Sequence, residues 1–226
     1  MALLSFGILS PAQAAQPATA APEELDCTAS GQIATFDGTN WVCAEAPRAF
    51  KYVFATSEVF EGNLGGIFDD PDSAGQATGA HAICNSLAGA AGLPGTYMAW
   101  IADDKNSPDT MFEKSEVPYV LADGKTQVAD NYADLTDCSG TCLDYPIVQV
   151  ETGRIYSGET EVWTNVSPNG TATGKARADS CGAWTGKSPA TRGASGRTGQ
   201  IGTTKDWTAG DTISCSSWRR LYCFEQ

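Results

Sequence analysis

An oxygen-rich loop at residues 103–109, with the sequence DDKNSPD, holds the side chains best suited to bind a cation. Carboxylate and amide oxygens are the ligands that calcium prefers in proteins. The spacing lacks the glycine and the terminal glutamate of an EF-hand loop. Acidic loops are more often solvated, so calcium is an alternative and no cofactor is required. The candidate calcium ligands are Asp103, Asp104, Asn106 and Asp109.

No catalytic constellation stands out. His81 is the only histidine, so a Ser-His-Asp or Cys-His catalyst would have to use it. It begins a predicted helix, where a histidine that faces solvent or donates to a loop carbonyl is the simpler interpretation. The serine motif G-x-S-x-G is absent, and neither glycine-rich phosphate motif occurs. We therefore expect that this protein is not an enzyme.

The eight cysteines favour disulfides over metal binding, because no CxxC pair occurs and histidine is scarce. One bridge closes a short hairpin, another a tight loop, and a third fixes a long irregular segment. The fourth joins a buried helix face to the last core strand. The expected pairs are Cys27 with Cys43, Cys138 with Cys142, Cys181 with Cys215, and Cys84 with Cys223. An oxidising compartment follows from this usage.

The helix around Cys84 and the strand after it form the predicted centre of the fold. Apolar residues recur at helical spacing from Ala80 to Ala91, and Gly92 can take the left-handed conformation that ends a helix. Residues 97–102 are apolar on both faces, which is typical of a central strand. Further strands are predicted at residues 50–56, 117–121, 126–129, 145–150, 161–164 and 218–224, with an irregular stretch at 170–210.

The chain divides into four predicted segments. Residues 1–15 combine a short apolar run with an Ala-Gln-Ala site, as in an export signal, although a basic start is missing. Residues 16–26 form a flexible leader, 27–46 a disulfide-closed hairpin module, and 50–226 one α+β domain. No stretch is long enough to span a membrane. We expect an exported protein, located outside the cell, on its surface or in the periplasm.

The charge balance argues against nucleic-acid binding. The formal net charge is −13, whereas phosphate contacts depend on clustered lysine and arginine. The charge is uneven, because residues 1–165 hold 6 basic and 23 acidic side chains, and residues 166–226 hold 8 and 4. Solubility and local pairing explain this distribution more simply than a charge-steered ligand site.

Several short motifs together resemble a known fold. They are residues 62–66 (GNLGG), Gly79-Ala80 with Cys84, residues 91–97 (AGLPGTY), residues 162–164 (VWT), Gly170, Cys181 with Trp184, and the pair Cys215 and Cys223. Residues 50–226 thereby resemble the endostatin-like branch of the C-type lectin fold, in particular a bacterial domain family related to endostatin. The resemblance implies a mixed, mostly antiparallel sheet, one or two helices, long irregular loops and two nested bridges.

The chain departs from that pattern in places that bear on metal binding. His81 stands where the family usually has aspartate, and an insertion lengthens residues 69–78. The Glu-Pro-Asn, Gln-Pro-Asp and Trp-Asn-Asp triplets of calcium-dependent lectins are absent, as are the N-terminal histidines of endostatin's zinc site. The hairpin at residues 27–43 is similar to a cysteine-bounded module of exported bacterial surface and fibre-like proteins, which implies a connector or spacer.

These observations favour a non-catalytic recognition or adhesion module whose ligand is an extracellular glycan or protein. Its binding surface is expected on the loops that carry Trp184, Arg192, Arg197 and Trp207, because arginine and tryptophan dominate recognition sites. The alternative for the tryptophans is burial beneath irregular backbone. Two other functions stay open: a structural subunit of a surface layer, filament or other assembly of its own copies, and a calcium-dependent lectin.

Overall fold

The computed structural model describes residues 27, 32–45, 48–68, 79–156, 161–173, 179–186, 192–197 and 204–226, with only the backbone at 192–197. The chain separates into two units, Met1–Arg48 and Ala49–Gln226. The expected export signal and leader lie outside the described residues, as does the whole insertion at 69–78.

The first unit contains a two-stranded hairpin. Strand β1 (Gln32–Phe36) pairs antiparallel with β2 (Trp41–Glu45). The Asp37 carboxylate accepts hydrogen bonds from the backbone N–H groups of Thr39 and Asn40 and so fixes the turn. The rings of Phe36 and Trp41 lie 5.6 Å apart on one face. The predicted hairpin is therefore confirmed.

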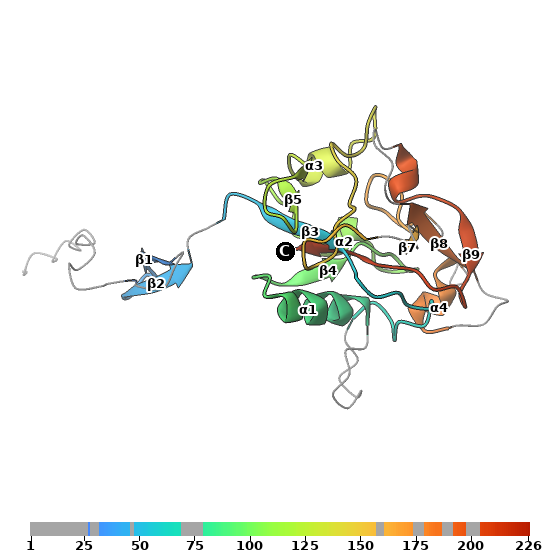
Figure 1. Cartoon of the computed structure of the whole chain (residues 1–226), viewed down its shortest axis with the longest axis horizontal. Coiled ribbons are helices and arrows are strands. Elements are labelled where there is room, and N and C mark those ends of the chain that lie inside the picture. The colour runs from blue at the N-terminus through green and yellow to red at the C-terminus, as the bar shows by residue number, and fades with distance from the viewer. Residues whose placement is uncertain are drawn as a thin grey trace, which may run out of the picture. The chain divides into compact units, whose positions relative to one another are not determined.

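A five-stranded sheet forms the centre of the second unit (Figure 1). Its order is β4 (Tyr97–Ala99), β10 (Tyr222–Glu225), β3 (Lys51–Ala55), β5 (Tyr119–Leu121) and β6 (Gln127–Ala129). Only β3 and β5 pair in parallel. The last strand of the chain thus lies beside the first strand of this unit. The α+β class and the mostly antiparallel sheet agree with the sequence prediction.

The long helix α1 (Ala80–Ala91) lies along β4 (Figure 1). Its apolar face is buried, and it ends at Gly92, which has φ 73° and donates to Ala88 and Gly89. The prediction of a central strand at residues 97–102 is wrong in its position, because β4 is an edge strand. Tyr97 and Ala99 are buried nonetheless and Met98 is half-buried, and α1 packs against this edge strand.

A three-stranded sheet is built from β7 (Glu161–Trp163), β8 (Arg192–Arg197) and β9 (Thr212–Ser214). The stretch at 170–210 therefore contains a strand that the sequence did not predict. The described short helical turns are α2 (Pro108–Met111), α3 (Tyr132–Leu135), α4 (Cys181–Trp184) and the 3-10 turn η2 (Lys205–Trp207). The strand predicted at 145–150 forms only isolated bridges, from Gln149 and Val150.

The five-stranded sheet separates two core clusters. Val53 and Phe54 are consecutive in β3 and belong to different clusters, as expected for side chains that alternate across a sheet. The cluster away from α1 is largely aromatic, with Trp100 in ring contact with Phe112, Tyr132, Trp207 and Phe224. The other cluster contains the two long-range bridges.

Candidate functional site

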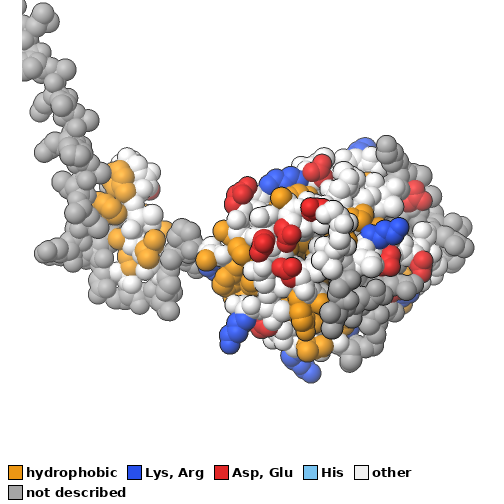
Figure 2. All heavy atoms as spheres, turned by 90° about the horizontal axis from the view of Figure 1, so that it is seen from above, with side chains coloured by type: hydrophobic (Ala, Val, Ile, Leu, Met, Phe, Trp, Pro, Cys, Tyr) orange, Lys and Arg blue, Asp and Glu red, His pale blue; other side chains and the backbone are white. Residues whose placement is uncertain are grey.

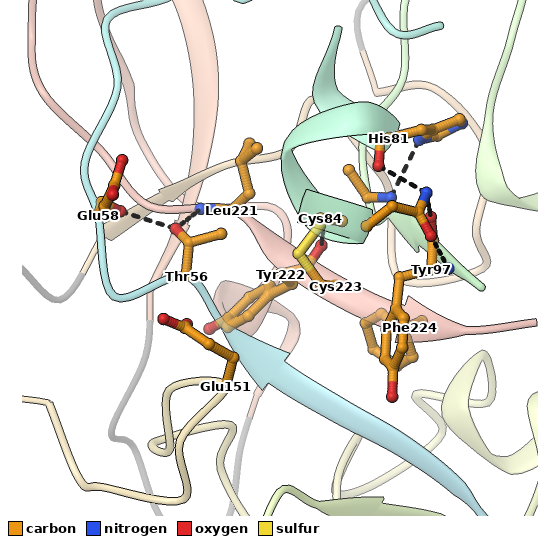
Figure 3. The surroundings of a disulfide bond; sticks show 12 residues. Thr56, Glu58, His81, Cys84, Tyr97, Glu151, Leu221, Tyr222, Cys223 and Phe224 are labelled. Atoms are coloured by element: carbon orange, nitrogen blue, oxygen red, sulfur yellow. Dashed lines mark hydrogen bonds between the residues drawn. A yellow bond between two sulfur atoms is a disulfide. The ribbon is translucent and has the colours of Figure 1, made fainter. Parts of the chain in front are cut away.

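Four disulfides use all eight cysteines, in the pairs that the sequence led us to expect. The bridge from Cys84 to Cys223 joins α1 to β10, and Figure 3 shows it between that helix and that strand. The bridge from Cys181 to Cys215 packs against Gly62, where a Cβ atom would overlap the Cys181 sulfur. The second unit is therefore cross-linked at two places in its core.

Both tryptophans of the expected ligand surface are core residues. Trp184 is 0% exposed, and its indole N–H donates to the Ala102 carbonyl at 2.9 Å. Trp207 is 3% exposed and packs on Trp100, with ring centroids 5.1 Å apart. Rings without exposed surface cannot contact a ligand, so the burial alternative holds for both and the assignment of these rings to a binding surface is wrong.

Arg192 and Arg197 lie at the two ends of β8, opposite Ser214 and Glu161 respectively. The structure thus separates their backbone positions along one strand. Their side chains lie outside the described part of the chain, so their proposed contribution to ligand binding stays a prediction.

The candidate calcium loop uses its first carboxylate to hold its own backbone. Asp103 is 8% exposed, and its Oδ1 accepts hydrogen bonds from the N–H groups of Lys105 and Asn106, each at 2.7 Å. Asp109 instead pairs with Lys114 at 3.0 Å, from within α2. Within the described ranges, no three His, Cys, Asp or Glu side chains are grouped as a metal site would require. A hollow of about 390 Å³ borders this loop.

His81 does not face solvent, contrary to the sequence interpretation. It is 7% exposed, and its Nδ1 accepts the Ala99 N–H at 3.0 Å (Figure 3). Burial lowers the pKa of His81 to about 4. The ring is therefore neutral at pH 7 and serves as a backbone acceptor at the edge of β4.

A second hollow, of about 410 Å³, lies where residues 149–156 turn beside the end of β3. The Ala55 N–H donates to the Gln149 carbonyl at 2.8 Å, and the Gly153 N–H closes the turn onto Val150 at 2.8 Å. We call this hollow the Glu151 pocket. Its lining residues are Ser57, Val150, Glu151, Thr152, Arg154, Ile155, Tyr156 and Arg220.

Two charged residues of the Glu151 pocket are buried. Glu151 is 6% exposed, and its Oε2 accepts the Ser57 N–H at 2.9 Å; Figure 3 places it beside the end of β3 that carries Thr56. Arg220 is 7% exposed, donates from Nη1 to the Ser57 carbonyl at 2.7 Å, and lies 4.8 Å above the Tyr156 ring. Buried charges are uncommon and call for partners.

Two further residues of the Glu151 pocket are open to solvent. Ile155 has an exposed fraction of 72%, the largest among the exposed large apolar residues of the described chain. Arg154 is also exposed, and its guanidinium makes no hydrogen bond or ion pair with any described residue. The pocket therefore combines an accessible cation, an apolar side chain and a buried carboxylate.

Sequence reasoning missed this pocket, because its lining residues come from three distant segments of the chain. Residues 145–150 looked like an ordinary strand, and Glu151 was one carboxylate among many. The only local signal was the Glu-Thr-Gly-Arg turn followed by an apolar residue.

Around these sites, acidic side chains are spread over one face of the second unit, with single basic side chains between them (Figure 2). No helix in the described ranges has the length and apolar character needed to cross a membrane. Comparison with protein-family models and with curated proteins gives no match to this sequence. The function must therefore be argued from the chemistry of the chain itself.

Proposed function

We propose that this protein is an exported, non-catalytic recognition or adhesion module whose second unit has a C-type-lectin-like, endostatin-like fold. Three features support the fold: the first and last strands of the unit pair, Cys84 is bridged to Cys223, and Cys181 is bridged to Cys215 within that loop. Four disulfides are typical of proteins outside the reducing cytosol. The ligand is an extracellular protein or glycan.

The Glu151 pocket is the observation that carries the recognition function. The end of β3, a closed turn and the segment just before β10 hold it, and scaffolds of regular structure that present loops are typical of binding modules. Its volume lies within the range of small-ligand sites. Its polar groups are a carboxylate, two guanidinium groups and hydroxyls, which suit recognition, and no described side chain in it is a nucleophile paired with a base.

Binding to immobilised glycans and extracellular proteins tests this function. Glu151→Gln and Arg154→Gln should each reduce binding of any ligand found. Glu116→Gln and Lys125→Gln are the matched controls, because both residues are exposed, lie outside the pocket and change the charge equally. Binding that is equal in all four variants would show that recognition, if present, uses another surface.

A structural subunit is the second candidate, supported by the hairpin unit. Ile33 and Val42 are 44% and 38% exposed on the same face, because Ile33 stands opposite Ala44 and Val42 opposite Thr35. A two-stranded hairpin with an open apolar face is marginal alone. Concentration-dependent assembly of the full chain without ligand would favour this role, and a monomer at all concentrations would exclude it.

A further inference from the structure

The two charged groups that open into the Glu151 pocket have opposite signs and spare hydrogen-bonding capacity. Glu151 is only 6% exposed. Among the described residues its carboxylate accepts one hydrogen bond, at Oε2 from the Ser57 N–H. An ionised carboxylate offers about four acceptor positions on its two oxygens. Such a buried group gains from a further donor, and most from a cationic one.

Arg154 supplies the complementary charge. Its guanidinium is exposed and makes no ion pair within the described residues, so none of those residues competes with a ligand anion for its donors. Arg220 differs, since its Nη1 is already committed to the carbonyls of Thr56 and Ser57 and its guanidinium lies over Tyr156. The accessible cation of the pocket is therefore Arg154, whereas Arg220 belongs to the wall.

We infer that the Glu151 pocket binds a zwitterionic amino compound, namely a free amino acid or a short peptide with both ends unblocked. This inference rests on the proposed recognition function and, for this pocket, replaces the protein or glycan ligand with a small zwitterionic one. The ligand's ammonium group donates to the Glu151 carboxylate, and its carboxylate accepts from the Arg154 guanidinium. Ile155, which is 72% exposed, offers an apolar surface to the ligand's side chain.

Charge complementarity separates this ligand from its competitors. A purely anionic ligand would meet the Glu151 carboxylate and the overall charge of −13, and a purely cationic one would meet Arg154 beside Arg220. A neutral sugar could satisfy both groups with hydroxyls, but it lacks the two opposite charges, so it gains none of the Coulomb attraction that a zwitterion gains at both residues. A zwitterion has no net charge and satisfies both residues.

Calorimetric titration of the full oxidised chain tests the inference with four probes: alanyl-leucine, its N-acetyl form, its C-terminal amide, and maltose. We expect the unblocked dipeptide to bind best, with each blocked form weaker by roughly tenfold or more. In Glu151→Gln, N-acetylation of the peptide should cause no further loss of affinity, because the partner of the ammonium group is already gone. In Arg154→Gln, amidation should cause no further loss of affinity, because the partner of the peptide carboxylate is already gone.

Glu116→Gln and Lys125→Gln should retain the wild-type preference for the unblocked dipeptide. Thermal unfolding of Glu151→Gln checks folding, and Arg154→Gln, an exposed substitution, keeps the test valid if Glu151→Gln is unstable. Equal binding of blocked and unblocked peptides, or no peptide binding, overturns the zwitterion. Maltose binding that both pocket variants abolish would overturn it while leaving recognition intact. If the pocket variants bind the peptides, maltose and the immobilised ligands as strongly as the wild type does, the pocket is not the binding site.

Discussion

Several polar side chains that could do chemistry instead satisfy backbone groups. His81 and Asn85 are one helical turn apart in α1, and together they cover the outer edge of β4. His81 accepts the Ala99 N–H, while Asn85 accepts the Tyr97 N–H at 2.7 Å and donates to the Tyr97 carbonyl at 2.8 Å. Unpaired edge strands invite association with other chains. These two side chains therefore replace a neighbouring strand.

The buried histidine predicts a specific pH dependence of stability. Burial lowers the pKa of His81 from 6.5 to about 4, so the unfolded state takes up a proton at a higher pH than the folded state does. The contribution of the neutral His81 ring to the free energy of unfolding is fully present above pH 6.5 and is lost as the pH falls toward 4. It amounts to about 3 kcal/mol. Urea unfolding at several pH values measures it.

His81→Asn is the matched variant, because the amide oxygen can still accept the Ala99 N–H but does not titrate. Its stability should lack the loss between pH 6.5 and 4 that the wild type shows. The same pH slope in both proteins would mean that His81 is not the titrating group.

Asp103 gives a second prediction at this scale. Asp103→Ala removes the acceptor of two backbone N–H groups and should lower the free energy of unfolding by about 1 to 3 kcal/mol. The exposed Asp104→Ala should have little effect. Because the Asp103 carboxylate is already engaged, millimolar calcium should leave the melting temperature unchanged. A calcium-dependent rise that Asp103→Asn abolishes would instead place an ion in this loop.

Among the elements, α4 is the most unusual, because all four of its residues have left-handed backbone. Cys181, Ala183 and Trp184 have φ of 48°, 60° and 62°, and Gly182 has 71°. This conformation costs a non-glycine residue roughly 1 to 2 kcal/mol. The bridge to Cys215 and the buried indole hold the turn, and its last carbonyl accepts the N–H groups of Leu64 and Gly66.

Three substitutions test how left-handed and helical backbone affect stability: two replace a glycine, with opposite expected effects on the free energy of unfolding, and one introduces a glycine. Gly182→Ala should destabilise the fold by about 1 kcal/mol through its φ of 71°, since the added Cβ meets no atom closer than 3.8 Å. Gly89→Ala, within α1 and with open space around it, should stabilise by about 1 kcal/mol. Ala183→Gly should relieve strain and raise stability by about 0.5 to 1 kcal/mol. A destabilised Ala183→Gly would contradict a left-handed turn.

The success of sequence prediction differed between elements for physical reasons. The helix end at Gly92, the hairpin around Gly124 and the final strand depend on local turn chemistry and periodicity, and these were predicted. The edge position of β4 depends on pairing with residues 124 to 128 positions away, which no local pattern contains. The Glu151 pocket was missed for the same reason, because Ser57, Glu151 and Arg220 meet only in the folded chain.

At the scale of the whole molecule, stability depends on bringing the two ends of the second unit together. The first strand β3 pairs with the last strand β10, and the bridge from Cys84 to Cys223 closes a loop with a sequence separation of 139. The bridge from Cys181 to Cys215 lies inside this loop, with a separation of 34. Long loops lose the most chain entropy on closure.

The bridges should therefore rank by loop length in their effect on unfolding of the second unit. In the chain-entropy account, loss of the Cys84–Cys223 bridge costs about 5 kcal/mol, loss of Cys181–Cys215 about 4, and loss of Cys138–Cys142 about 2. Paired cysteine-to-alanine variants, compared by urea unfolding, measure this order. Removal of Cys27–Cys43 is the control, because that bridge lies in the other unit. If the short loop's bridge mattered most, local packing rather than chain closure would dominate the fold.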